Sequence, residues 1–326
     1  MRVGLAYDLR SDYLAMGYGL EETAELDAEE TIAGLEEAIR AKGHETCRIG
    51  RLDALTAALA AGERWDMVFN IAEGLYGLGR ESAVPAVLDA HRIPYVFSDP
   101  MVLALTLHKG MTKRVARDLG LATPDFAVVS GPEDIGAVDL PYPLFAKPVA
   151  EGTGKGVESS SKIHDRAGLE AVCLRLLKLY EQPVIVERYL PGREFTVGVV
   201  GNGAKARVVG VMEIILKEGA APEGYTYANK ADYERVCEYR LADDAPAREA
   251  ADLALAAFKG LGVRDAGRAD IRLDERGRAS FMEINALPGL NPLHSDLPIM
   301  AAMRGVSYEA LIGSILDAAA VRIFGA

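Results

Sequence analysis

The 326-residue sequence predicts an α/β protein that begins with a parallel sheet and changes to α+β architecture in its C-terminal part. Two observations lead to this fold class. Short apolar segments alternate with segments of helical spacing over residues 1–98, an order typical of a parallel sheet with right-handed crossovers. Residues 267–285 instead contain two successive strand-like segments joined by a polar turn, which indicates an antiparallel pair.

The first predicted unit, residues 1–98, contains four strands and three helices. We expect strands at residues 2–7, 44–49, 66–70 and 93–97. The helix expected at 27–42 places Ile32, Leu35 and Ile39 at helical spacing, and further helices are expected at 53–61 and 81–91. The glycine-rich loop after Asn70 follows a strand, and ligands bind at the carboxyl ends of strands in such sheets.

Two further units are expected to follow. The second, residues 99–186, has predicted helices at 109–119 and 165–180 and predicted strands at 126–129, 144–147 and 184–187. The third, residues 187–326, has longer strands and is closed by helices at about 246–260 and 307–322.

Composition limits the classes of function. Half of the residues are hydrophobic and 26% are charged, which is a normal globular balance. The net charge of -12 argues against a nucleic-acid partner. The three cysteines are far apart, which favours a reducing compartment and argues against a zinc site. Without a signal peptide or a membrane-length apolar run, we expect a cytoplasmic protein with no membrane partner.

The strand pair at 267–285 carries a candidate metal site. Side chains alternate across a strand, so Asp270 shares a face with Arg268. On the second strand the alternation places Glu283 and Asn285 on one face with Phe281. Antiparallel pairing would bring Asp270 close to Glu283 and Asn285, and Mg²⁺ prefers such oxygen ligands together with substrate phosphates. The pattern predicts an ATP·Mg²⁺ site, with Mn²⁺ as an alternative ion; a solvated acidic face is the competing interpretation.

A glycine-rich loop is the second nucleotide signal. The predicted strand at 144–147 ends in Lys147 and is followed by the sequence Gly152-Thr153-Gly154-Lys155-Gly156. Successive glycines let backbone N–H groups turn towards an anion. The loop is neither a P-loop nor a Rossmann fingerprint, and such loops are often only turns. Farther along, Glu187 and Leu190 could hold adenine and Glu194 the ribose, although surface exposure would explain these glutamates equally well.

Several segments, in order, resemble the ATP-grasp enzymes and most closely the D-alanine–D-alanine ligase family. They cover about residues 66–323 and read DMVFNIAEGLYG, IPYVFSDP with LHKGMTKRVARDLGLATP, LFAKPVAEGTGKGV, VIVERYLPGREFTVGV, YTYANK, GRADIRL and MEINALPGLNP. The resemblance implies an ATP-grasp fold behind the N-terminal parallel-sheet domain. It also implies a ligase that activates a carboxylate as an acyl phosphate, captures it with an amine, and releases ADP and phosphate. A homodimer is implied as well.

The resemblance assigns roles residue by residue. Lys109 and Lys147 would contact ATP phosphates under cover of Gly152, Thr153 and Gly154. Adenine would be held by Glu187, Arg188 and Leu190, and ribose by Glu194. Lys230 would reach the terminal phosphate, and Asp270, Glu283 and Asn285 would hold Mg²⁺. Arg268 and the Gly289 backbone would steady the reacting carbonyl, so the catalytic set is Arg268, Lys230, Gly289 and Thr153.

The departures from the family pattern lie at the amino-acid site. Residues 7–19, YDLRSDYLAMGYG, lack the family's Gly-Gly loop and its ammonium-binding glutamate. Glu73 replaces a usual histidine, Thr153 a serine and Ala231 a tyrosine, and the segment before His294-Ser295 is one residue longer. The candidate substrate residues are therefore Glu73, Arg268, Gly289, His294 and Ser295.

Three functions remain open at this point. The first is a carboxylate–amine ligase that acts on small amino-acid or carboxylate substrates and need not use D-alanine. The second is a true D-alanine–D-alanine ligase of cell-wall synthesis with an unusual pocket. The third is a nucleotide-binding regulatory protein without turnover.

Overall fold

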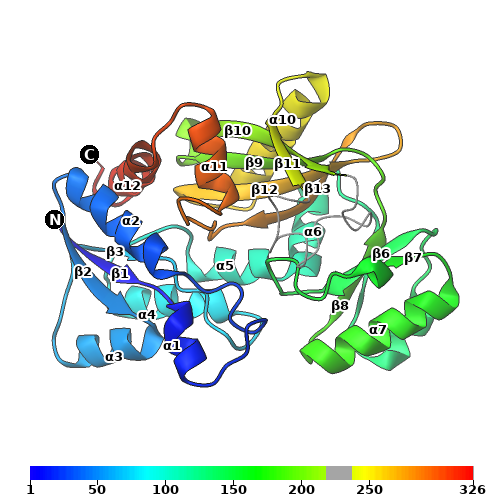
Figure 1. Cartoon of the computed structure of the whole chain (residues 1–326), viewed down its shortest axis with the longest axis horizontal. Coiled ribbons are helices and arrows are strands. Elements are labelled where there is room, and N and C mark those ends of the chain that lie inside the picture. Colours follow the sequence, from blue (N-terminus) through cyan, green and yellow to red (C-terminus); the bar gives the residue numbers. More distant parts are fainter. Residues whose placement is uncertain (218–236, 326) are drawn as a thin grey trace.

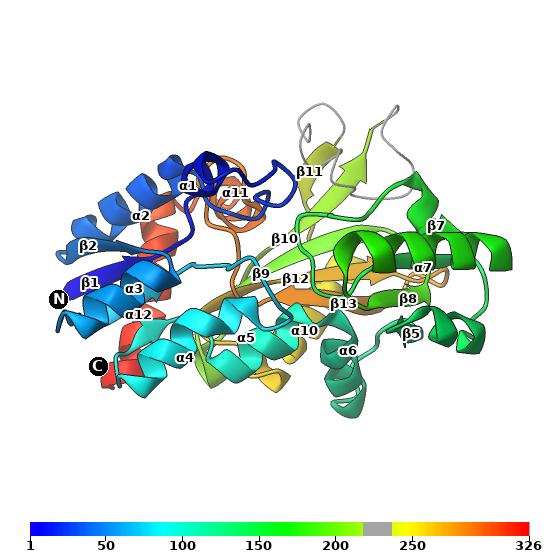
Figure 2. The same cartoon turned by 90° about the horizontal axis from the view of Figure 1, so that it is seen from below.

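The computed structural model describes residues 1–217 and 237–325 (Figure 1). Three sheets follow one another along the chain: four strands ordered β2-β1-β3-β4, four strands ordered β5-β8-β6-β7, and five strands ordered β11-β10-β9-β12-β13. The N-terminal sheet and the central sheet lie at opposite ends of the molecule, as Figure 2 shows. Short 3₁₀ turns occur at η1 (Arg80–Ser82), η2 (Pro132–Ala137), η3 (Ser159–Ser161) and η4 (Gly203–Lys205).

The N-terminal sheet is parallel, as the alternation of strands and helices predicts. Its strands are β1 (Arg2–Ala6), β2 (Glu45–Gly50), β3 (Met67–Asn70) and β4 (Tyr95–Val96). Helices α2 (Glu29–Ala41) and α12 (Tyr308–Phe324) cover one face, and α3 (Leu52–Ala60) and α4 (Ala83–Ala90) cover the other. Ile32, Leu35 and Ile39 of α2 are fully buried there, which confirms the apolar face predicted from their helical spacing. A short helix, α1 (Arg10–Ala15), was not predicted from the sequence.

The central sheet is antiparallel and is covered by one helix. Strands β5 (Phe126–Val129), β8 (Val184–Arg188), β6 (Leu144–Pro148) and β7 (Lys162–Ile163) pack their inner face against α7 (Arg166–Tyr180). Two helices precede it, α5 (Pro100–Leu107) and α6 (Lys109–Asp118). Asp99 begins α5 by accepting a hydrogen bond from the Val102 N–H, with proline at the first helical position.

The C-terminal sheet provides the largest core. Strands β9 (Glu194–Val200), β10 (Arg207–Leu216), β11 (Cys237–Leu241), β12 (Ala266–Leu273) and β13 (Ala279–Asn285) are antiparallel. Helix α10 (Ala245–Gly260) packs on this sheet, and α11 (Asp296–Met303) packs near β9 and β10. The predicted helices at 246–260 and 307–322 correspond to α10 and α12.

The predicted pairing of β12 with β13 is confirmed, with one correction. Asp270 lies opposite Glu283, and Arg268 lies opposite Asn285. A β-bulge follows Asp270, so Ile271 pairs with Phe281. The simple alternation that placed Phe281 on the face of Glu283 was wrong, because the extra residue of the bulge reverses the side-chain direction. Phe281 is fully buried in the core instead.

A buried aspartate connects the N-terminal and C-terminal units. Asp265 is fully buried and adopts a positive φ of 65°. Its carboxylate accepts hydrogen bonds from the Phe97 N–H at 2.8 Å, from Asn202 Nδ2 at 2.8 Å and from Arg322 of α12 at 2.6 Å. We name this set of contacts the Asp265 clasp.

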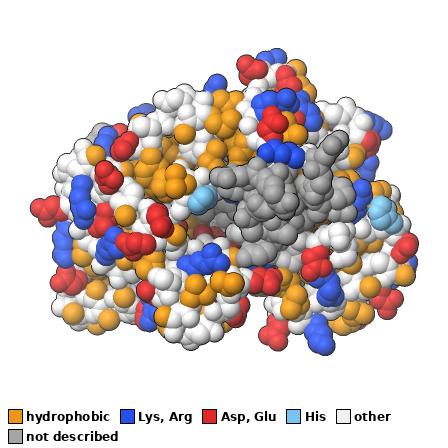
Figure 3. Space-filling model, in the orientation of Figure 1, with side chains coloured by type: hydrophobic (Ala, Val, Ile, Leu, Met, Phe, Trp, Pro, Cys, Tyr) orange, Lys and Arg blue, Asp and Glu red, His pale blue; other side chains and the backbone are white. Residues whose placement is uncertain are grey.

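Among the described residues, no single helix is long and apolar enough to span a membrane, and only the sharply bent pair α11 and α12 meets the length and composition criteria together. On the face shown in Figure 3, basic side chains are interspersed with acidic ones.

Candidate active site

A pocket of about 120 Å³ lies between the central and C-terminal sheets. Nearly all the residues predicted to bind ATP line this pocket, including those at the ends of β6 and β8 and in the glycine loop. They are Lys109, Lys147, Gly152, Thr153, Gly154, Glu187, Arg188, Leu190 and Glu194. Asp270 and Glu283 line the same pocket. Lys230 lies outside the described residues. We name the pocket of about 120 Å³ the nucleotide-side pocket.

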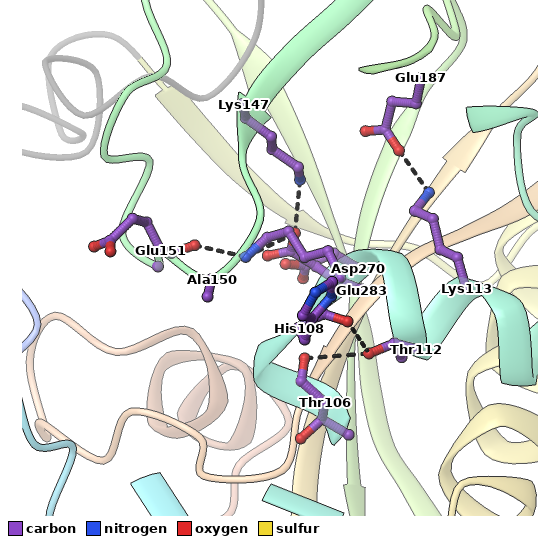
Figure 4. Close-up of polar contacts among 12 residues, drawn as sticks. Thr106, His108, Thr112, Lys113, Lys147, Ala150, Glu151, Glu187, Asp270 and Glu283 are labelled. Atoms are coloured by element: carbon purple, nitrogen blue, oxygen red, sulfur yellow. Dashed lines mark hydrogen bonds and ion pairs between the residues drawn. The ribbon is translucent and has the colours of Figure 1, made fainter. Parts of the chain in front are cut away.

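Two lysines approach Glu283 in the lining of this pocket, and Figure 4 shows one of them, Lys147, beside the carboxylate. Lys147 Nζ lies 2.7 Å from Glu283 Oε2, and Lys109 Nζ lies 3.9 Å from it. Lys109 also donates to the Glu151 carbonyl oxygen at 2.6 Å. Burial opposes ionisation of Glu283, but the two lysine charges outweigh it and lower its pKa. The carboxylate is therefore held ionised beside two cations.

A buried ion pair involves Glu187, which lines the nucleotide-side pocket. Lys113 Nζ lies 2.6 Å from Glu187 Oε2, and the two side chains are 0% and 1% exposed. Lys113 also donates to Thr123 Oγ1 at 3.2 Å. The sequence analysis missed Lys113, although its spacing of four residues from Lys109 places both on one side of α6. Glu187 is thus not a surface glutamate, and the solvent-exposed interpretation is wrong for this residue.

The glycine loop is held by a residue of the N-terminal unit. Thr153 has φ of 52° and Gly154 has φ of 72°, a backbone conformation that is unusual for threonine. The Gly152 N–H donates to Glu25 Oε1 at 2.8 Å, and Lys155 Nζ lies 3.2 Å from the same carboxylate. Glu25 also pairs with Arg80 at 2.7 Å. The backbone N–H that was predicted to face phosphate therefore binds an internal carboxylate in this structure.

A larger cavity of about 610 Å³ adjoins the first. The two share Lys109, Glu151, Gly152, Thr153 and Glu283 in their linings, so each opens onto the same carboxylate and lysine. All the candidate substrate residues line the larger cavity: Glu73, Arg268, Gly289, His294 and Ser295. We name this the substrate-side cavity.

Three carboxylates, Asp27, Glu73 and Glu81, form an acidic wall of the substrate-side cavity. Neither Glu73 nor Glu81 forms an ion pair within the part of the chain that the structure describes. Burial, reinforced by the charges of Glu81 and Glu25, raises the pKa of Glu73 well above its usual value. Burial and the neighbouring Asp8 raise the pKa of Asp27 to about 8. Burial also raises the pKa of Glu81 to about 7. A cationic group among them would stabilise their ionised forms.

Asp27 and Glu81 were not singled out from the sequence. Arg10, from the N-terminal segment that departs from the family pattern, lines this cavity together with residues 24–28. A weak signal for Asp27 was available, because it is an acidic residue at the start of the helix predicted at 27–42, where such side chains often cap the helix.

On the opposite wall, Arg268 is held by two aspartates. Arg268 Nη2 lies 3.1 Å from Asp270 Oδ2, and Nη1 lies 3.1 Å from Asp296 Oδ2. Gly289 approaches Ser295 so closely that an added Cβ would lie 2.8 Å from Ser295 Oγ. Ser295 Oγ in turn accepts a hydrogen bond from the Asn291 N–H at 2.9 Å. Asp296 was missed by the sequence analysis.

The predicted Mg²⁺ ligands fit the ion by chemistry. Asp270 and Glu283 face each other across β12 and β13, and both line the nucleotide-side pocket. Asn285 lies opposite Arg268 on the same strand pair and lines the substrate-side cavity, and its amide oxygen is the atom that could bind Mg²⁺. Within the described residues, no three His, Cys, Asp or Glu side chains converge as a metal site of their own. The predicted set has two carboxylates and one amide, which leaves further positions for substrate oxygens.

Comparison with known proteins agrees with this architecture. The sequence profile described as the D-ala D-ala ligase C-terminus matches residues 115–317. The chain is 35% identical over 263 residues to an uncharacterised protein of Sinorhizobium fredii, covering 79% of this chain and 76% of that one. It is 35% identical over 273 residues to the D-alanine–D-alanine ligase of Bordetella petrii, covering 82% of this chain and 80% of that one.

A solved structure extends the likeness to the whole fold. The D-alanine–D-alanine ligase of Bacillus anthracis, crystallised with ATP, matches with a TM-score of 0.72 at 20% identity and covers 99% of this chain and 98% of that one. The fold and the pocket between two sheets define an ATP-grasp protein, as the sequence analysis expected. The chain belongs to the D-alanine–D-alanine ligase family of ATP-dependent ligases.

Proposed function

We propose that this protein is an ATP-dependent ligase that joins a carboxylate to an amine through an acyl phosphate. One observation carries the proposal: the nucleotide-side pocket and the substrate-side cavity meet at Lys109 and Glu283. A γ-phosphate held there would lie where a carboxylate in the larger cavity can attack it. The substrate's carboxylate oxygen would form the new bond to phosphorus, ADP would leave, and an amine would then displace phosphate from the acyl carbon.

ATP is proposed to occupy the nucleotide-side pocket. Lys109, which is buried, and Lys147, which is partly buried, would neutralise its phosphates, because both are already directed at an anion, the Glu283 carboxylate. The wall formed by Glu187, Arg188 and Leu190 would hold adenine, and Glu194 would hold the ribose. The complex of the Bacillus anthracis ligase with ATP supports this assignment of ligand.

Asp270, Glu283 and Asn285 would hold Mg²⁺. The ion would supply charge neutralisation for the phosphate oxygens. Lys147 and Lys109 would then be freed in part from Glu283 to contact phosphates. Because mutual repulsion among anionic oxygens is strong in a buried site, several fixed positive charges are required to hold the nucleotide and the carboxylate in line.

Arg268 and the Gly289 backbone are proposed to stabilise the oxygen of the reacting carbonyl. The Arg268 side chain is 15% exposed and fixed from two sides, so little reorganisation would be needed when charge develops on that oxygen. Thr153 would keep the glycine loop over the phosphates and limit the access of water to the acyl phosphate. Lys230 and Thr153 complete the catalytic set proposed from the sequence.

The acidic wall is proposed to recognise an ammonium group on the carboxylate substrate. Glu73 is the central residue of this proposal, and Asp27 and Glu81 add further acceptors. Amino acids fit this requirement, as does the family to which the chain belongs. The Glu73→Gln variant should raise the KM of one amino substrate and leave the KM of ATP nearly unchanged. Parental values of both constants would show that the ammonium binds elsewhere.

The decisive experiment is a screen of D- and L-amino acids and hydroxy acids, singly and in pairs, for release of ADP and phosphate with Mg²⁺ and ATP. Products are identified by mass spectrometry, which separates a true D-alanine–D-alanine ligase from a ligase with other substrates. If no carboxylate or pair stimulates ADP release while ATP binds with micromolar affinity, the ligase proposal is wrong and the protein is a nucleotide-binding regulator.

A further inference from the structure

Asp296 is the first residue of α11 and is directed into the active site rather than to solvent. Its side chain is 9% exposed, and Oδ2 lies 3.1 Å from Arg268 Nη1. The residue before it, Ser295, is the N-cap of the helix. Asp296 therefore reaches β12 from a different structural element and lines the substrate-side cavity as it does so.

The Arg268 guanidinium is held from both sides. Nη2 lies 3.1 Å from Asp270 Oδ2 on the same strand, and Nη1 lies 3.1 Å from Asp296 Oδ2 on α11. The remaining nitrogen, Nε, is buried and has no hydrogen-bond partner. Two carboxylates thus fix the plane of the fork and leave other N–H groups for a ligand.

The two anchors are not equivalent. Asp270 lines the nucleotide-side pocket and also accepts from Thr196 Oγ1 at 2.9 Å, whereas Asp296 lines only the substrate-side cavity. If Asp270 held Mg²⁺ as proposed above, its carboxylate would be shared between the metal and Arg268. Asp296 would then be the anchor that serves Arg268 alone.

We propose that Asp296 is a positioning residue that fixes Arg268 at the reacting carbonyl throughout the reaction. It acts through Arg268 and does not touch the reacting atoms itself. This inference rests on the proposed function, because Arg268 acts on a carbonyl oxygen only in a ligase. A role confined to starting α11 is the competing explanation, since an acidic residue in the first turn also stabilises a helix.

Kinetics separate the two explanations. With the amino-acid pair that gives the largest ADP release, Asp296→Asn should lower kcat at least tenfold and change the KM of ATP less than twofold. Asp296→Glu should recover part of kcat, because it restores the charge. Asp317→Asn is the matched control, since Asp317 lies on α12 with a side chain that is 61% exposed, and its kcat should be parental.

A double-mutant cycle tests whether the effect passes through Arg268. In the Arg268→Lys background, Asp296→Asn should lower kcat less than twofold further. A full tenfold loss in that background, or a parental kcat in the single variant, overturns the proposal. A lower melting temperature with an unchanged kcat would assign Asp296 to helix stability alone.

A spectroscopic measurement keeps this inference distinct from the proposed function. In protein labelled with ¹⁵N-arginine, the Arg268 Nε–H signal is assigned by its loss in Arg268→Lys. Asp296→Asn should speed its hydrogen exchange at least tenfold, and Asp317→Asn should not. If exchange is unchanged in Asp296→Asn, the positioning role is wrong whether or not the parent is a ligase. If exchange responds but the substrate screen shows no turnover, Asp296 positions Arg268 as inferred and only the ligase proposal fails.

Discussion

Replacing Lys113 by methionine should destabilise the protein strongly, because it removes the ion-pair partner of the buried Glu187 carboxylate. The two side chains are 0% and 1% exposed and are joined at 2.6 Å. Methionine retains most of the apolar stem, so the lost packing is small compared with the lost charge. The carboxylate then loses its ion-pair partner at a position where water barely reaches it, which costs free energy.

The magnitude follows from the burial of both partners. Removal of one partner from a fully buried pair costs about 3–5 kcal/mol. For a urea slope of about 3 kcal/mol/M, the upper end of the range for small proteins, this corresponds to a fall of about 1–1.7 M in the unfolding midpoint. The double variant Lys113→Met with Glu187→Gln should recover more than half of the loss, since no uncompensated charge remains.

The assay is urea unfolding followed by circular dichroism without nucleotide, so that any role of Glu187 in binding adenine does not enter. Lys178→Met is the matched control, because Lys178 is an exposed lysine on α7, the helix that covers the same sheet. Its midpoint should be parental. A midpoint for Lys113→Met within about 0.3 M of the parent, which at this slope is a loss of about 1 kcal/mol or less, would refute the argument that the buried pair stabilises the fold strongly.

Glu283→Gln should keep the fold and abolish most turnover, because it removes a proposed metal ligand, and unchanged activity and Mg²⁺ dependence would contradict that assignment. Lys147→Met should weaken ATP binding or lower kcat, as measured by nucleotide titration and steady-state kinetics; parental values in both would rule out phosphate contact. Arg268→Lys should lower kcat by about 10²–10³, since a fixed donor at a developing oxyanion is worth about 2.7–4 kcal/mol. The KM of the amino substrate should rise as pH falls from about 8.5 to 6. The pKa values of Asp27 (about 8) and Glu81 (about 7) are raised, so these carboxylates take up protons in this pH range and lose their attraction for an ammonium group. The KM of ATP should stay flat, and parallel changes in both constants would remove the acidic wall from substrate recognition.

The parallel N-terminal sheet and the β12–β13 pair could be predicted because their signals are local. Apolar periodicity and side-chain alternation depend only on neighbouring residues, so the facing of Asp270 and Glu283 followed from the sequence. The nucleotide residues came together as expected because the resemblance covers the segments that carry them. Their roles remain predictions.

The remaining features depend on contacts between distant segments. The residues around Phe281 carry no sequence signal for the β-bulge that directs its side chain into the core, because a bulge depends on how two strands pair. Glu25 and its partner Gly152 are 127 positions apart in the chain, and Arg268 and its partner Asp296 are 28 positions apart. Such pairs arise from the packing of whole units, which a single sequence does not display.

The Asp265 clasp has a mechanical consequence. It ties Phe97 of the N-terminal unit, Asn202 beside the C-terminal sheet and Arg322 near the chain end to one fully buried carboxylate. The central unit meets the N-terminal unit beside the glycine loop, where Glu25 accepts from the Gly152 N–H, Arg80 donates to the Ala150 carbonyl oxygen at 2.7 Å, and Tyr180 donates to Glu21 at 2.7 Å. Because the carboxylate that joins the N-terminal and C-terminal units is fully buried, we expect these two units to move as one rigid body, with any movement of the central sheet taking place about the segments beside the glycine loop.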